Sequence, residues 1–277
     1  MFCRFKIFVF IFLITGTFIT KGQDIDDIYR IDSYKFACPT SDEYLKQLYK
    51  VGIKSLNNDE HVNLAGKIFF QIIEKDKALC DAYYFTGVSL TKQDKHKAAL
   101  TYYFYADSLS SSPNLKFKEE LAEAALRVSS VGLARKEYEN IVEKFPNSPI
   151  GFYGIGLTAT SLGDYERGIE CLELAEQKFV QINSLTEKRK SEVLLMKGIL
   201  YTQLKQYEEA VVSFEGCEDM FGQLLDYLAN YAWSTYNLYL QTHDVKWEEK
   251  CKATLSKLRK LPTITQEFLD KFTFKSE

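Results

Sequence analysis

The chain has 277 residues and a formal net charge of −3 at pH 7, and 46% of its residues are hydrophobic, 14% aromatic and 26% charged. A chain of this length and composition buries a globular core without disulfide bonds. The mild acidity argues against nucleic acid or an anionic bilayer as the main partner, because both favour clustered Lys and Arg. The longest basic run is only Lys188-Arg189-Lys190, which is typical of a solvated helix end.

The N-terminal segment has the pattern of a secretory signal peptide. Arg4 and Lys6 precede an apolar run over residues 7–19, and small residues precede Gln23. We therefore predict removal of residues 1–22 and export to the periplasm or the extracellular space, with no direct membrane insertion afterwards. The alternative is an uncleaved membrane tether. The apolar run is too short for this alternative, because a membrane-spanning helix needs about 20 apolar residues.

Residues 23–40 form an acidic leader that lacks helical periodicity, and we predict that this leader is partly ordered. Removing residues 1–22 takes away three of the 35 basic residues and none of the 38 acidic ones, so the mature chain is also acidic. Helices are expected to begin near Ser41, because Ser41-Asp42-Glu43 resembles an N-terminal cap.

From residue 41 to 275 the sequence has the period of a helical-repeat array. Two stripes of apolar and small residues, each spaced as one helical face requires, make a hairpin that recurs at intervals of about 34 residues. The predicted units cover about 46–79, 80–113, 115–148, 149–182, 191–224 and 225–258, and a short capping helix covers 264–274. The additional residues at about 181–188 are interpreted as about two added helical turns at a hairpin tip.

Small residues stand at equivalent positions of successive units. In the first helix of the hairpins they are Gly87, Ala122, Gly156 and Gly198, and in the second helix they are Ala99, Ala134, Gly168 and Ala210. A glycine inside a helix costs about 1 kcal/mol relative to alanine, so we expect neighbouring helices to approach closely there. The five prolines, at positions 39, 113, 146, 149 and 262, all fall at predicted helix boundaries.

This pattern resembles the tetratricopeptide repeat, a helical hairpin of 34 residues. The resemblance is carried by Tyr83, Gly87, Ala99, Leu121, Ala122, Ala134, Tyr138, Pro146, Phe152, Gly156, Tyr165, Ala175, Gly198, Tyr201, Tyr207, Ala210 and Phe214. It covers about residues 46–258 and implies an all-α fold, an α-α superhelix (solenoid) of about six hairpins with the capping helix at its end. Lys197 and Gly168 depart from the family pattern, and the end units fit it less closely.

The resemblance also implies a partner-binding groove, because the first helices line the concave groove in this family. The residues that would project into this groove are Tyr84, Val88, Glu119, Glu123, Tyr153, Leu157, Leu195 and Ile199. Such a mixture of apolar and acidic side chains suits an extended peptide or a partner helix. The Lys and Asn arrangement with which some members bind a C-terminal carboxylate is missing at these positions.

No residue pattern predicts catalysis, a cofactor or a metal ion. The three histidines are separated by whole helices, and the sequence has no HExxH motif, no glycine-rich phosphate loop and no CxxC pair. Five cysteines follow residue 22, and an odd number leaves at least one thiol unpaired. Their pairing stays open. Among the possible disulfide bridges, Cys38 to Cys80 is the least implausible.

These observations predict a non-enzymatic scaffold for protein-protein interactions in the cell envelope or the secreted space, with a protein or peptide as its partner. The alternative is a repeat domain that assists nutrient or carbohydrate capture, or that carries a cryptic hydrolase site.

Overall fold

The computed structural model describes residues 34–274, and this part of the chain contains helices, turns and no strand. The predicted signal peptide and residues 23–33 of the leader lie outside the described residues. Within 34–274, no helix has the length and apolar character needed to cross a membrane. The described chain divides into two compact units, the N-terminal unit (residues 34–151) and the C-terminal unit (residues 152–274).

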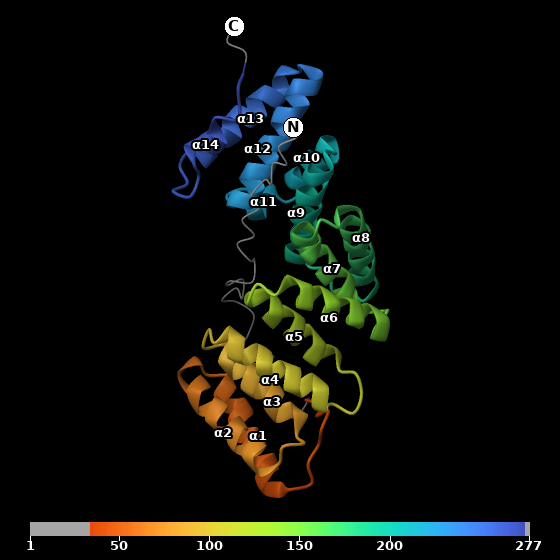
Figure 1. Cartoon of the computed structure of the whole chain (residues 1–277), viewed down its shortest axis with the longest axis vertical. Helices are drawn as coiled ribbons and strands as arrows, with labels where there is room; N and C mark the ends of the chain where they lie inside the picture. The colour runs from red at the N-terminus through yellow and green to blue at the C-terminus, as the bar shows by residue number, and fades with distance from the viewer. Residues whose placement is uncertain (1–33, 275–277) are drawn as a thin grey trace, which may run out of the picture. The chain divides into compact units, whose positions relative to one another are not determined.

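The N-terminal unit consists of consecutive helical hairpins (Figure 1). Its helices are α1 (Glu43–Leu56), α2 (Val62–Lys75), α3 (Cys80–Thr91), α4 (His96–Leu109), α5 (Leu115–Arg127) and α6 (Val131–Lys144), with the short helix η2 (Asp59–His61) before α2. Each helix packs against the next one along the chain. Its aromatic core passes from one hairpin to the next, since the ring of Phe69 on α2 stacks on Phe85 of α3 at 5.0 Å.

Side chains cap the first turn of two α-helices in this unit, α1 and α5. The Asp42 side chain accepts hydrogen bonds from the backbone N–H groups of Tyr44 and Leu45, which confirms the predicted cap at the start of α1. The Asn114 side chain caps α5 in the same way. These caps satisfy donors that a helix cannot pair internally.

The C-terminal unit continues the hairpin pattern. Its helices are α7 (Pro149–Leu162), which begins just before the division, α8 (Tyr165–Gln181), α9 (Glu187–Leu204), α10 (Tyr207–Glu215), α11 (Glu218–Phe221), α12 (Leu225–Thr242), α13 (Val245–Leu258) and α14 (Gln266–Leu269). Pro149 occupies the first helical position, where its missing N–H group costs nothing. Together the two units confirm the predicted all-α fold of consecutive hairpins.

The glycines expected at close helix approaches lie there. A Cβ atom on Gly87 would stand 2.7 Å from the Tyr103 ring, and one on Gly198 would stand 2.8 Å from the Phe214 ring. A Cβ on Gly156 would collide with Leu172. All three glycines are buried. Within each hairpin, the missing side chain on the first helix therefore makes room for a large side chain on the second.

The connection between α8 and α9 differs from its prediction. Residues 182–186 are not helical, and they join two hairpins instead of forming the tip of one. The additional length lies partly in α8 and α9, which have 17 and 18 residues. Periodicity locates an insertion but does not tell whether its backbone continues a helix.

The C-terminal end of the described chain packs on α12. The Tyr236 hydroxyl donates to the backbone oxygen of Thr273 at 3.0 Å, and the Tyr236 ring lies 5.2 Å from the ring of Phe272. Phe272 is buried. Residues 272–274 therefore cover part of the last long hairpin.

Candidate partner-binding face

The first helices of the three N-terminal hairpins, α1, α3 and α5, provide the face that corresponds to the predicted groove. Tyr84 of α3 is fully buried, because its ring stacks on Phe117 of α5 at 5.1 Å. Val88 is also buried, with 4% of its surface exposed. Glu119 and Glu123 on α5 are half-buried and retain accessible surface.

The leader lies against this same face. The ring of Tyr34 lies 4.8 Å from the ring of Phe85 on α3, and the ring of Phe36 lies 4.8 Å from that of Tyr49 on α1. The Lys116 ammonium on α5 lies 5.9 Å from the centre of the Tyr34 ring, within reach of a cation-π interaction. Residues 34–38 therefore contact the first helix of all three hairpins.

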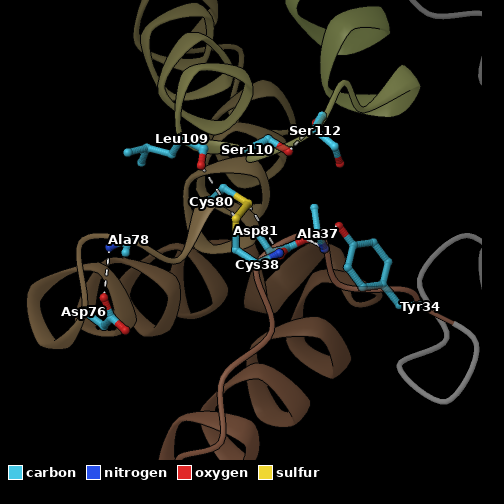
Figure 2. Close-up of a disulfide and its surroundings, with 10 residues drawn as sticks. All are labelled: Tyr34, Ala37, Cys38, Asp76, Ala78, Cys80, Asp81, Leu109, Ser110 and Ser112. Atoms are coloured by element: carbon cyan, nitrogen blue, oxygen red, sulfur yellow. Dashed lines mark hydrogen bonds between the residues drawn. A yellow bond between two sulfur atoms is a disulfide. The ribbon is translucent and has the colours of Figure 1, made fainter.

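A buried carboxylate holds the backbone of the leader. Asp81, in the first turn of α3, accepts hydrogen bonds from the Tyr34 hydroxyl at 2.8 Å and from the backbone N–H groups of Ala37 and Cys38 at 3.2 and 2.7 Å. Figure 2 shows these groups converging beside the disulfide. Burial raises the pKa of Asp81, and the hydrogen bonds from Cys38, Tyr34 and Ala37 oppose that rise. Because a charged carboxylate in such a place needs donors, the leader contributes to its stability.

A disulfide bond between Cys38 and Cys80 fixes the leader covalently to α3 (Figure 2). Its Cα atoms are 5.6 Å apart, which is within the usual range for a disulfide. The pairing that the sequence left open is thus the Cys38 to Cys80 bridge. Cys38, Cys80 and Asp81 are also the group of potential metal ligands in the described residues, but both sulfur atoms are bonded to each other.

The α5 side of the face is acidic. Burial and the neighbouring carboxylates of Glu123 and Glu119 raise the pKa of Glu120. Burial lowers the pKa of Lys116, and the nearby carboxylates of Glu120 and Glu119 oppose that decrease. The face therefore combines aromatic rings at α1 and α3 with carboxylates at α5.

In the C-terminal unit, Tyr153 belongs to a cluster that joins α7, α8 and α9. Its hydroxyl donates to Glu192 at 3.2 Å, and the Arg189 guanidinium lies 4.5 Å from the centre of its ring and 5.3 Å from that of Phe179. Arg189 also pairs with Glu192 at 3.0 Å. Burial raises the pKa of Tyr153, as does the Glu192 carboxylate. The Tyr153 ring thus stabilises the α8–α9 junction.

The other predicted groove residues of this unit differ in how much of their surface is exposed. Leu157 is half-buried, whereas Leu195 and Ile199 are 0% and 4% exposed. Both buried residues lie on α9, which packs against α8, α10 and α12. A helix that packs against several others keeps little of its surface for a ligand.

Two comparisons with known proteins, one with a family model and one with solved structures, agree with this architecture. Residues 151–177 and 191–223 match the family model of the tetratricopeptide repeat. These two segments of the chain therefore carry tetratricopeptide repeats. None of the curated proteins compared matches the chain.

Solved tetratricopeptide-repeat structures share the fold at low sequence identity. Pseudomonas aeruginosa pilF is 16% identical, with a TM-score of 0.61 over 83% of this chain and 96% of that one. MamA from Desulfovibrio magneticus RS-1 is 14% identical, with a TM-score of 0.57 over 67% and 99%. YrrB, described as a TPR protein with an unusual peptide-binding site, is 17% identical, with a TM-score of 0.53 over 73% and 96%. These likenesses establish the fold.

The structure corrects the predicted groove for four of its eight residues. Tyr84, Val88, Leu195 and Ile199 are buried between helices and do not offer surface to a partner. The repeat register assigns a residue to the first helix, but the next hairpin decides whether the residue remains accessible. Glu119, Glu123, Tyr153 and Leu157 retain partial exposure.

Repeat periodicity gives no indication of the contribution of the leader. Asp81 stands next to Cys80, and Tyr34 and Phe36 stand just before Cys38. Two aromatic residues beside a cysteine indicate a segment that can pack. This signal is present in the sequence even though the leader lacks helical periodicity. The partner of that segment, about 45 residues further along the chain, could not be found from spacing alone.

Proposed function

We propose that the chain is an exported, non-enzymatic scaffold that binds a peptide or a helix of a partner protein along the first helices of its tetratricopeptide repeats. The observation that carries the proposal is the repetition of the hairpins. In each unit the interior is filled by paired helices, and the first helices keep half-buried polar positions, such as Glu119 and Glu123 on α5. Rigid helical hairpins presenting such positions in series suit protein recognition.

Export is supported by two independent features. The sequence of residues 1–22 has the signal pattern, and the Cys38–Cys80 disulfide is of a kind that persists in oxidising compartments. We expect the mature chain to begin at Gln23, and mass spectrometry of the protein from its native source would measure this. A mature chain that keeps residues 1–22 would instead support the membrane-tethered alternative.

Site-specific photo-crosslinking tests the binding face. A photoreactive amino acid at Glu119 or Glu123, on the first helix α5, should yield crosslinks to one partner protein in a native extract. The same amino acid at Lys136, an exposed residue of the second helix α6, is the matched control and should yield none. Equal crosslinking from both helices, or none from α5, would contradict the proposed face.

The alternative function has a separate readout. If the chain assists carbohydrate capture, saccharides should raise its melting temperature, and the α5 positions should give no protein adduct. That result would replace the protein-interaction proposal.

A further inference from the structure

The leader contacts the first-helix face in the way that an extended peptide ligand would. Its rings at Tyr34 and Phe36 are two residues apart, and they contact Phe85 and Tyr49 on two different helices. Two consecutive N–H groups that follow the rings, those of Ala37 and Cys38, donate to one carboxylate on Asp81. Main-chain hydrogen bonds with alternate side chains on a surface are a recurring mode of peptide recognition.

The receptor side of this contact belongs to the repeat fold. Tyr49, Phe85 and Asp81 are all buried, and they lie on α1 and α3 within one compact unit. Asp81 is 0% exposed, and three of its hydrogen bonds come from the leader. A buried carboxylate whose donors leave must regain donors or be neutralised. The face therefore favours any segment that brings two N–H groups and an aromatic hydroxyl to the same place.

We propose that the α1–α3–α5 face is a binding site for an extended peptide with two aromatic side chains two residues apart, and that residues 34–38 are its intramolecular occupant, locked by the Cys38–Cys80 disulfide. This inference rests on the proposed function, because it names the class of partner that the face accepts. The occupant in the structure has the sequence Tyr-Lys-Phe-Ala-Cys. A partner segment of similar chemistry would compete with it.

The disulfide controls that competition. Cys38 is half-buried and Cys80 is fully buried, so an external dithiol reaches the Cys38 sulfur first. Its thiolate attacks the Cys38 Sγ, the S–S bond breaks, and the Cys80 sulfur leaves as a thiolate that takes a proton from solvent. The second thiol of the reductant then displaces Cys38, which leaves two protein thiols and an oxidised dithiol. The Asp81 Oδ2 atom lies 3.8 Å from the Cys80 Sγ, so its negative charge opposes formation of the leaving thiolate and slows the exchange.

Peptide binding to full-length chains tests the proposal. The probe is a fluorescein-labelled peptide with the sequence of residues 34–40 and Ser in place of Cys38, measured by fluorescence anisotropy. Three chains are compared: the oxidised wild type, C38S/C80S, and C38S/C80S with Y34A/F36A. The last variant weakens the tethered occupant but keeps Tyr49, Asp81 and Phe85 intact. A peptide with Ala at both aromatic positions is the control ligand.

The expected order follows from competition within the chain. A tethered segment acts at a millimolar effective concentration, so the probe should bind the Y34A/F36A/C38S/C80S chain at least about tenfold more tightly than the oxidised wild type. C38S/C80S should lie between the two, and adding D81N to the tightest chain should weaken binding again. Absence of probe binding to a folded Y34A/F36A/C38S/C80S chain, or equal binding of the Ala control peptide, would overturn the proposal.

A second measurement avoids the variants. In the wild-type chain reduced with dithiothreitol, excess unlabelled peptide should speed hydrogen exchange at the Ala37 and Cys38 amides at least about tenfold, because it displaces the leader. Unchanged exchange would overturn the proposal.

If these tests fail while photo-crosslinking from Glu119 and Glu123 still captures a partner, only this inference is wrong. If the probe binds but no partner is captured, the scaffold function fails instead.

Discussion

Pairs of a small and a large residue determine how closely the helices of one hairpin pack. Gly87 faces Tyr103, and Gly198 faces Phe214, at distances that leave no room for a Cβ atom. Tyr103 and Phe214 are both fully buried, so neither ring can move aside into solvent. The glycine therefore compensates for its poor helix propensity by permitting a large aromatic contact.

Replacing Gly87 by Ala tests this pairing. The added methyl group would meet the Tyr103 ring at 2.7 Å, and overpacking of this kind costs roughly 1–3 kcal/mol. The gain in helix propensity, about 1 kcal/mol, offsets part of that cost. We expect a lower free energy of unfolding in urea.

Gly132 provides the matched control. It is exposed on α6, and a Cβ atom there would meet nothing within 4 Å. Gly132→Ala should therefore stabilise the chain by up to about 1 kcal/mol. If Gly87→Ala were as stable as Gly132→Ala, close approach would not be the reason for glycine in the first helix.

At the scale of elements, the leader behaves as an additional packed segment of the N-terminal unit. Residues 34–40 have no regular secondary structure. Asp81, the rings of Tyr49 and Phe85, the Lys116 ammonium and a disulfide nevertheless hold this segment against α1, α3 and α5. Similar contacts occur next to the non-helical connection between α8 and α9. There, Arg189 and Glu192 of α9 contact Tyr153 of α7. In both places, polar and aromatic contacts replace the regular repeat.

Removing the disulfide should destabilise the chain measurably. The two cysteines are 42 residues apart in sequence, and closing a loop of that length lowers the entropy of the unfolded chain by an amount worth up to about 4 kcal/mol. We therefore expect C38S/C80S to lower the free energy of unfolding by about 2–4 kcal/mol in urea denaturation.

Reduction of the wild type is the matched control for that variant. Cys171, Cys217 and Cys251 are buried and lie outside the disulfide, so a reductant leaves them unchanged. Reduced wild type and C38S/C80S should then unfold at similar urea concentrations. An oxidised wild type no more stable than either one would show that the bridge contributes nothing to stability.

At the scale of the whole molecule, stability is distributed over successive hairpins. Within each compact unit, most helices pack mainly against their neighbours in the chain, as in other repeat proteins. Contacts between neighbours in sequence are the ones that a periodic pattern predicts. For this reason, the hairpins, the cap at Asp42 and the positions of Gly87, Gly156 and Gly198 could be predicted without coordinates.

Other features required the tertiary structure. The sequence alone determined the repeat period, the helical hairpins and the small residues at helix contacts, because these depend on residues within about one repeat of each other. The folded chain decided that Tyr84 and Leu195 are buried, that Cys38 pairs with Cys80, and that Asp81 holds the leader. The physical reason is that accessibility and pairing depend on which distant segments share a surface, and local periodicity contains no record of those distances.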